Sequence, residues 1–320
     1  MSESEGLGAR GSGLGTPGCR PLPSAARSSS LGHGASTVAE LHAELTAALD
    51  DADVPDARGE ARDMIAALLD VPRFWPTANR GALIDDECRA SALAAVSRRA
   101  AGAPFAYAVG RSAFRHLTLD VDERVLIPRQ ETEVLVDLVL EATAGTSGGT
   151  IADVGTGSGA IALALATEGR FDRVIATDVS LDALAVARRN AAHLAGALRA
   201  RLDFRHGSLL APLAAERGLR AIVSNPPYVA FGEALALPPS VRDWEPALAL
   251  FSGDNGMAAT AAIVAGASAL LASGGLLALE VDTRRASLVA ELCMADGRYR
   301  DVSVRLDLTG RERFVLASRL

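Results

Sequence analysis

The sequence predicts an α/β protein, with a parallel β-sheet covered by helices on both faces, preceded by a small helical domain and a β-hairpin. Two observations lead to this fold class. From Thr150 onward, short apolar segments rich in Val and Ile alternate with longer segments of helical periodicity, which is typical of a parallel sheet between two helical layers. Between residues 36 and 103, apolar residues recur three or four positions apart, as they do along one face of a helix.

The composition indicates a soluble globular chain and excludes several kinds of chemistry. Hydrophobic residues make up 49% of the 320 residues, yet no apolar stretch is long enough to span a bilayer. The net charge of -7 argues against stable nucleic-acid binding. All basic residues are arginine, so a lysine Schiff base and a P-loop lysine are excluded.

The cysteines and the first residues bear on the compartment. Cys19, Cys88 and Cys293 are widely separated and odd in number, which predicts neither a disulfide framework nor a metal site and fits a reducing, cytoplasmic location. Residues 1–35 are rich in Gly, Ser, Pro and Arg without apolar periodicity, which predicts a disordered tail. This tail lacks the apolar block of a secretory signal, and its glycines and prolines oppose the amphipathic helix of a transit peptide.

Three helices are expected in residues 36–103. Ser36 is a candidate cap for the first helix and Asp56 for the second, and the third spans about 85–99. Their inner faces carry Val38, Leu41, Leu45 and Leu49, then Met64, Ile65, Leu68 and Leu69, then Leu93 and Val96. The spacing of these residues predicts a small packed helical domain.

Residues 104–127 change to a period of two. The segment "FAYAVGRSAFRHLTLDVDERVLI" alternates around Gly110 and predicts a β-hairpin or two short strands that link the domains. Pro128 then opens a helix and begins the α/β domain, residues 128–320.

The α/β domain has a regular order of elements. Strands are expected at "TIADV", "RVIATD", "RLDFRH", "RAIVSN" and "GLLALEV", and helices from about Ala160, from about Leu181 and over 258–271. The final segment, "DVSVRLDLTGRERFVLAS", predicts two antiparallel edge strands around Gly310.

The stretch "DVGTGSGAIALALA" follows a strand and opens a helix. Its three glycines permit a tight turn and a close approach of the backbone to a ligand. Such a loop alone is a weak signal, because many nucleotide-binding folds use one. The residues of this loop that we expect at a cofactor are Asp153, Gly155, Thr156, Gly157, Ser158 and Gly159.

Two carboxylates narrow the choice of cofactor. Asp178 ends the next strand, where a carboxylate can accept hydrogen bonds from both hydroxyls of a ribose. Asp153 stands two residues before Gly155, where it would repel the pyrophosphate of a dinucleotide and would suit the ammonium group of a methionine moiety. The loop therefore favours S-adenosylmethionine over a dinucleotide.

The strand "RAIVSN" delivers "NPPY", residues Asn225, Pro226, Pro227 and Tyr228, to the same edge of the sheet. An amide nitrogen is a poor nucleophile unless its N–H bonds are directed so that the lone pair localises on nitrogen. The Asn225 side-chain oxygen and the Pro226 carbonyl can accept those N–H bonds, and the prolines keep the acceptors preorganised. Tyr228 can stack on a planar substrate group. We therefore interpret these four residues as the catalytic loop rather than as a simple turn.

The chain resembles the HemK/PrmC-type protein-(glutamine-N5) methyltransferases, the release factor glutamine methyltransferases. The resemblance covers about 36–320 and rests on "VLIPRQETE", "DVGTGSGAIALALA", "SNPPY" and "LPPSVRDWEPALALFSGDNGM". It implies a Rossmann-like domain that transfers a methyl group from S-adenosylmethionine, and a helical substrate-binding domain over 36–103. It also implies release factors as protein substrates, modified at the glutamine of their Gly-Gly-Gln motif, and it places Leu209 beside the cofactor. A monomer without membrane or stable nucleic-acid contacts is expected.

Several alternatives stay open. An adenine-N6 methyltransferase on RNA or DNA would use "NPPY" in the same way, and a non-catalytic scaffold would keep the fold without the chemistry. A paralogue that methylates another protein or a small molecule is also compatible, since "EVDTRRA" stands where the family commonly has "EIG-x-x-Q". His116 and His206 are given no catalytic role, because amide methylation needs no strong base. Trp244 and Glu245 are expected to brace the loop over the site.

Overall fold

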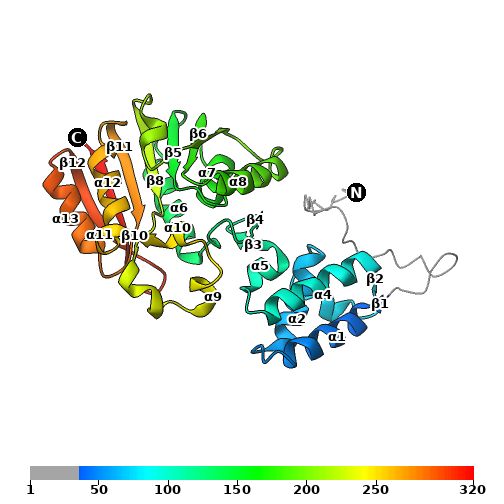
Figure 1. Ribbon diagram of the computed structural model, residues 1–320. Helices are drawn as coiled ribbons and strands as arrows, with labels where there is room; N and C mark the ends of the chain where they lie inside the picture. The colour runs from blue at the N-terminus through cyan, green and yellow to red at the C-terminus, as the bar shows by residue number, and fades with distance from the viewer. Residues whose placement is uncertain (1–35) are drawn as a thin grey trace, which may run out of the picture. The chain divides into compact units, whose positions relative to one another are not determined.

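The computed structural model describes residues 36–320 (Figure 1). The predicted tail over 1–35 lies outside the described residues. The chain divides into two compact units, one that ends at Val109 and one that begins at Gly110.

The first unit is helical. Its elements are β1 (Ser36–Thr37), α1 (Val38–Asp50), α2 (Ala57–Leu68), α3 (Trp75–Ala78), β2 (Leu83–Ile84), α4 (Asp86–Ala100) and α5 (Phe105–Val109). The three expected helices are present as α1, α2 and α4. Their apolar faces share one core, which includes Leu41, Leu45, Met64, Ile65 and Val96.

The predicted cap of α2 is confirmed, and the predicted cap of α1 was wrong. Thr37, not Ser36, caps α1, because its hydroxyl accepts the Glu40 N–H while the Glu40 side chain accepts the Thr37 N–H. Ser36 lies in β1, paired with Ile84. Asp56 caps α2 as predicted, since its side chain accepts the Gly59 N–H.

The linking segment is only partly a hairpin. The strands β3 (Arg111–Phe114) and β4 (Leu117–Asp120) form an antiparallel pair. The prediction that the segment from Phe105 alternates as strand was wrong, because Phe105–Val109 is the helix α5. Ala108 and Val109 of α5 pack into the core of the helical unit, so tertiary burial outweighed the local alternation.

The second unit is a layered α/β domain. Within the described residues, one sheet has the strand order β12-β13-β11-β8-β5-β6-β7. The strands are β5 (Thr150–Val154), β6 (Arg173–Asp178), β7 (Arg201–His206), β8 (Leu219–Ser224), β11 (Leu271–Glu280), β12 (Tyr299–Leu306) and β13 (Glu312–Arg319). The strands β11, β8, β5, β6 and β7 run parallel to one another. Strand β13 pairs with β11 in the antiparallel direction, and β12 pairs with β13 in the antiparallel direction. The predicted α/β class and the antiparallel terminal pair are confirmed.

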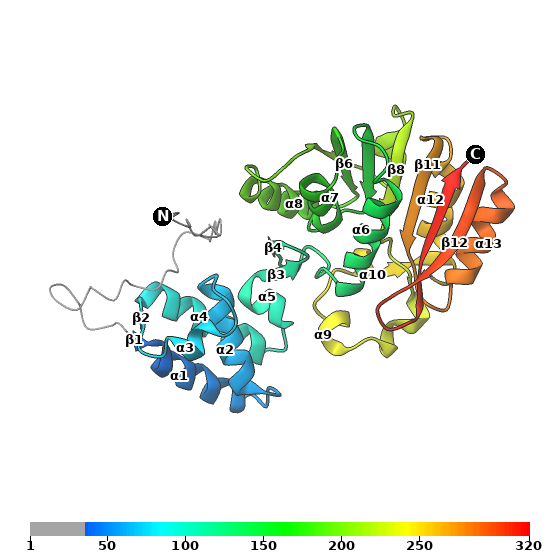
Figure 2. The ribbon, with the colours of Figure 1, turned by 180° about the vertical axis from the view of Figure 1, so that it is seen from behind.

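Helices cover both faces of this sheet (Figures 1 and 2). They are α6 (Gln130–Ala142), α7 (Ala160–Glu168), α8 (Leu181–His193), α12 (Ala258–Ala267) and α13 (Ala286–Asp296). Alternate strand residues serve the two faces: Ala221 and Val223 pack with α6 and α7, whereas Ile222 packs with α12 and α13. Burial on both faces explains why the central strands β5, β6, β8 and β11 contain consecutive apolar residues.

The helix expected over 258–271 ends earlier, at Ala267. Leu271 begins β11 and pairs with Leu219, so the last residues of the predicted helix cannot be helical.

Several short helices and strands follow the strands of the main sheet in the second unit. They are η1 (Ala211–Leu213), β9 (Val229–Ala230), η2 (Phe231–Ala236), α9 (Pro239–Arg242), α10 (Ala247–Leu250), β10 (Phe251–Ser252) and α11 (Gly253–Gly256). Over residues 36–320, no helix is both long enough and apolar enough to cross a membrane.

Candidate functional site

A cavity lies at the carboxyl ends of the parallel strands, where open α/β sheets bind ligands. Its walls come from the ends of β5, β6 and β8, from the segment before α6 and from α10. The predicted residues that line it are Gly155, Gly157, Asp178, Leu209, Asn225, Pro226 and Pro227. Parallel pairing of β5 with β6 and β8 therefore brings together residues that are far apart in the sequence.

The glycine loop leaves room for a ligand. Gly155 and Gly157 have φ angles of 76° and 55°, a backbone conformation that favours glycine. A Cβ added at either position would meet no protein atom within 4 Å, so a side chain there would occupy the space beside the cavity. This arrangement is a backbone cradle and fits a cofactor in close contact with the loop.

Asp153 stabilises the glycine loop by hydrogen bonds and does not face the cavity. It is fully buried and does not line the cavity. Its Oδ2 accepts the Thr156 hydroxyl over 2.6 Å and the Ala162 N–H over 3.1 Å. Among the described residues its Oδ1 has no hydrogen-bond partner. Thr156, Ser158 and Gly159 also lie outside the cavity lining, so these residues shape the loop and their direct contact with a cofactor stays a prediction.

Burial gives Asp153 a measurable effect on stability. Desolvation raises the pKa of this carboxyl to about 7, against the opposing hydrogen bonds from Thr156 and Ala162. The folded state then binds more protons than the unfolded state between about pH 4 and 7, so the contribution of Asp153 to the free energy of unfolding falls as pH rises through this window. We expect Asp153→Asn to flatten that decline, by up to about 4 kcal/mol. Urea unfolding at several pH values measures it, and an unchanged pH dependence in the variant would contradict this role.

Asp178 faces the cavity from the end of β6. Its Oδ2 accepts the Gly157 N–H and its Oδ1 accepts the Ser180 N–H, each over 2.9 Å. Each carboxylate oxygen keeps a second lone pair, which can accept a ribose hydroxyl. The acceptor oxygens of Asp178 therefore fit the ribose of S-adenosylmethionine.

The "NPPY" segment contributes to the walls of two cavities. Asn225 and Pro226 line the cavity described above and also a second one, which Tyr228 and Arg129 help to form. Ser224, just before the segment, anchors β8 to β5 through a 2.6 Å hydrogen bond from its hydroxyl to the Val154 carbonyl. A group bound in the second cavity would thus meet the first cavity at Asn225.

Burial raises the pKa of Tyr228 to about 12, so its phenol stays neutral at physiological pH.

A buried ion pair fixes the wall of the second cavity. Arg129 donates to the Glu245 carboxylate, which also accepts the Ile127 N–H over 3.3 Å. The Glu245 side chain is 1% exposed. Desolvation raises its pKa, and Arg129 opposes that shift. The prediction that Glu245 braces the loop fits this geometry.

Gly256 lies close to the backbone of "NPPY". Its φ is 87°, and a Cβ there would come within 2.2 Å of the Tyr228 carbonyl oxygen. We expect Gly256→Ala to displace the Tyr228 backbone and to lower the rate of methyl transfer about tenfold or more, since small displacements of positioning groups are costly. Gly232→Ala, at a position with no atom within 4 Å of the added Cβ, is the matched control. Equal rates for the two variants would contradict the support assigned to Gly256.

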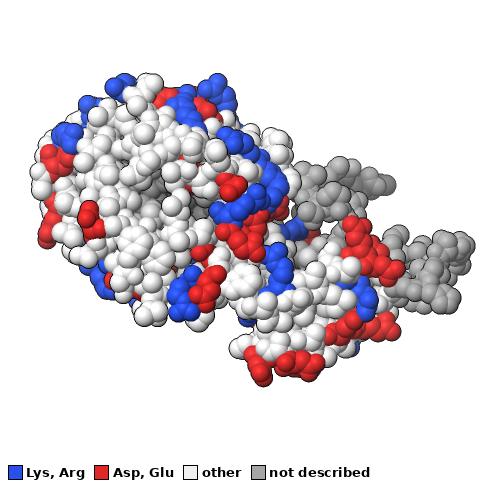
Figure 3. All heavy atoms as spheres, in the orientation of Figure 1, with Lys and Arg blue, Asp and Glu red and all other residues white. Residues whose placement is uncertain are grey.

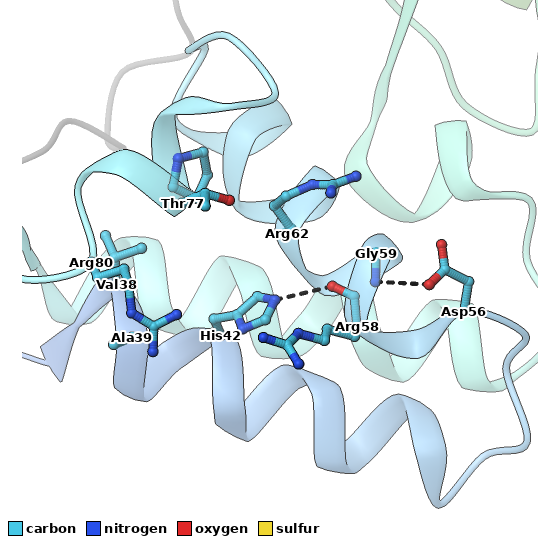
Figure 4. A pocket seen from close by; sticks show the side chains of 10 residues that line it. Val38, Ala39, His42, Asp56, Arg58, Gly59, Arg62, Thr77 and Arg80 are labelled. Atoms are coloured by element: carbon cyan, nitrogen blue, oxygen red, sulfur yellow. Dashed lines mark hydrogen bonds between the residues drawn. The ribbon is translucent and has the colours of Figure 1, made fainter.

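A further pocket lies in the helical unit, between α1 and α2 (Figure 4). His42 Nε2 lies 3.0 Å from the Arg58 carbonyl oxygen, and the Gly59 N–H donates to the Asp56 side chain. Helix capping and packing thus explain its polar contacts. We assign it no part in the chemistry, because none of the predicted site residues lies in it.

Comparison with known proteins decides the family. The chain is 47% identical over 227 residues to the release factor glutamine methyltransferase of Moorella thermoacetica, covering 70% of this chain and 78% of that protein. It is 41% identical to the protein of the same name from Deinococcus radiodurans, covering 88% of this chain and 98% of that protein. The chain belongs to the release factor glutamine methyltransferase family.

Family models agree with the two units. Residues 129–236 match the methyltransferase small domain and residues 40–110 match the PrmC N-terminal domain. The expectations of a methyltransferase, of a Rossmann-like α/β domain and of S-adenosylmethionine as cofactor are confirmed by this membership.

The sequence patterns did not indicate two buried polar residues that lie next to the site. Thr132 and Glu280 are buried and bonded to each other beside Asn225. Glu280 lies in "GLLALEV" and is the last residue of β11, and an acid at the end of an apolar strand is the signal that could have found it.

Proposed function

We propose that this protein transfers the methyl group of S-adenosylmethionine to the side-chain amide nitrogen of a glutamine, in the Gly-Gly-Gln motif of peptide chain release factors. One observation carries the proposal: Asn225 and Pro226 line both the cavity that Asp178 faces and the second cavity. The names of the relatives support the substrate. We place the protein in the cytoplasm and expect it to act as a monomer.

The chemistry follows from the groups at this boundary. S-Adenosylmethionine supplies an electrophilic methyl group when bound. The Asn225 Oδ1 and the Pro226 carbonyl can accept the two N–H bonds of a substrate amide, so that its nitrogen lone pair is directed away from the acceptors. The methylated nitrogen is acidic and loses its proton without a strong base. His206 is consistent with this account, since its Nε2 lies 3.0 Å from the Val179 carbonyl oxygen, in a strand-end contact.

The amino group of adenine is the main competing substrate, because it is also a planar nitrogen. On the face that Figure 3 displays, arginines are interspersed with aspartates and glutamates rather than gathered in one basic stripe. This mixture, with the net charge of -7, gives little support for a nucleic-acid backbone.

Transfer of labelled methyl groups tests the function. The purified protein, labelled S-adenosylmethionine and either a release factor or total RNA and DNA are incubated at equal substrate mass. We expect label in the release factor alone. Label in the nucleic acid would overturn the proposal in favour of the adenine-N6 reaction.

A catalytically silent scaffold is tested separately. Calorimetric titration with S-adenosylmethionine is expected to show one binding site. Absence of binding would favour the scaffold, whereas binding without transfer to the release factor would favour a different substrate.

A further inference from the structure

We propose that Glu280, acting through Thr132, sets the orientation of the Asn225 side-chain amide, and that both are positioning residues for methyl transfer. The proposal rests on the proposed function for its kinetic part. It assigns a task to two buried polar residues that line neither cavity.

The sheet brings the three residues together. Leu279 of β11 pairs with Ser224 of β8, so Glu280, the last residue of β11, and Asn225, the first residue after β8, are neighbours at the carboxyl edge of the sheet. Thr132 lies in the first turn of α6, a helix that packs on this face of the sheet. Thr132 is 4% exposed and Glu280 is 1% exposed, so water has little access to the pair.

Burial raises the pKa of Glu280 to about 7, and in its ionised form Glu280 can only accept, which gives the hydrogen bonds a defined direction. The Thr132 hydroxyl donates to Glu280 Oε2 over 2.7 Å. Its single proton is thereby used, and its oxygen can only accept from a further partner. Asn225 Nδ2 donates to that oxygen over 3.1 Å. Glu280 thus determines which half of the Asn225 amide faces Thr132.

The reverse orientation is disfavoured. A flipped amide would place Oδ1 against the lone pairs of the Thr132 oxygen, unless the hydroxyl left Glu280 without its donor. In the observed orientation, no group among residues 36–320 donates to Asn225 Oδ1. The acceptor that the substrate amide needs is therefore kept available, beside both cavities.

Thr132→Val removes the hydroxyl with little change in shape and frees the Asn225 amide to rotate. We expect single-turnover methyl transfer to fall about ten- to a hundredfold, somewhat less than the effect of losing a direct preorganised contact. Cofactor affinity should change less than threefold, which separates positioning from folding of the cavity. Thr132→Ser, which keeps the hydroxyl, should restore most of the rate. Thr143→Val, at the far end of α6, removes a hydroxyl that bonds the Val139 carbonyl and is the matched control.

A double-mutant cycle tests whether Thr132 acts through Asn225. In the Asn225→Ala background, Thr132→Val should cause no further loss of rate, because the amide it orients is absent. Independent, multiplying losses would overturn the proposal. So would a Thr132→Val variant that transfers methyl groups as fast as the unaltered protein.

A readout without substrate keeps this inference separate from the proposed function. The side-chain amide resonance of Asn225, assigned by its disappearance in Asn225→Ala, should exchange with solvent slowly in the unaltered protein and faster in Thr132→Val. Equal exchange in both would overturn the proposed orientation, whatever the substrate. Failure of the unaltered protein to methylate a release factor would instead contradict the proposed function alone.

Discussion

Asn225→Asp is expected to lower single-turnover methyl transfer by at least about 10²-fold, the typical effect of removing a preorganised polar contact. Aspartate keeps an acceptor but cannot donate to the Thr132 oxygen as Asn225 Nδ2 does. It also adds a negative charge beside the cationic cofactor and near buried Glu280. That charge stabilises the sulfonium before transfer and loses its partner as the methyl group leaves, so it opposes the chemical step.

Cofactor affinity separates this mechanism from misfolding. In Asn225→Asp the dissociation constant of S-adenosylmethionine should stay within about tenfold, because the change favours the ground state. Asn255→Asp makes the same chemical change at an exposed residue of α11 with a φ of 55°, outside both cavities, and should leave transfer nearly unchanged. Near-normal transfer by Asn225→Asp would reduce "NPPY" to an ordinary turn.

Asp178→Ala is expected to weaken binding of S-adenosylmethionine about ten- to a hundredfold. Hydrogen bonds to a charged acceptor contribute roughly 1.5–3 kcal/mol. The variant loses the carboxylate that we propose accepts the ribose hydroxyls, and it loses the hydrogen bond from the Gly157 N–H. Calorimetric titration measures the change in affinity.

The neighbouring exposed carboxylate provides the control for Asp178. Asp182 lies in the first turn of α8 and does not line the cavity, so Asp182→Ala changes the net charge equally without touching the site. Unchanged affinity in a folded Asp178→Ala variant would reject the ribose contact.

Local patterns predicted the elements that are periodic and buried. The apolar strands with Asp178 and Asn225 at their ends have one consistent location, since parallel strands present their carboxyl ends at the same edge. The helix α5 could not be predicted in the same way, because Ala108 and Val109 are buried by a core built from distant helices. Ser36 and Thr37 are both good caps, and only the reciprocal bond with Glu40 selects Thr37.

The chemistry of single side chains was harder to predict than their position. Asp153 was expected to face an ammonium group, but the structure turns one of its oxygens toward Thr156 and Ala162, behind the loop. Spacing along the chain shows that a carboxylate lies near the turn and does not show which way it points. The contact between Thr132 and Glu280 joins residues 148 positions apart, and no local pattern encodes it.

The position of the transferred methyl group shows whether the protein methylates the Gly-Gly-Gln glutamine of a release factor. A release factor is incubated with the purified protein and labelled S-adenosylmethionine, and the modified peptide is mapped by mass spectrometry. A second release factor with the Gly-Gly-Gln glutamine replaced by glutamate serves as the comparison. We expect one methyl group, on that glutamine, and no transfer to the release factor that carries glutamate. Equal labelling of both release factors, or label at another residue, would contradict it.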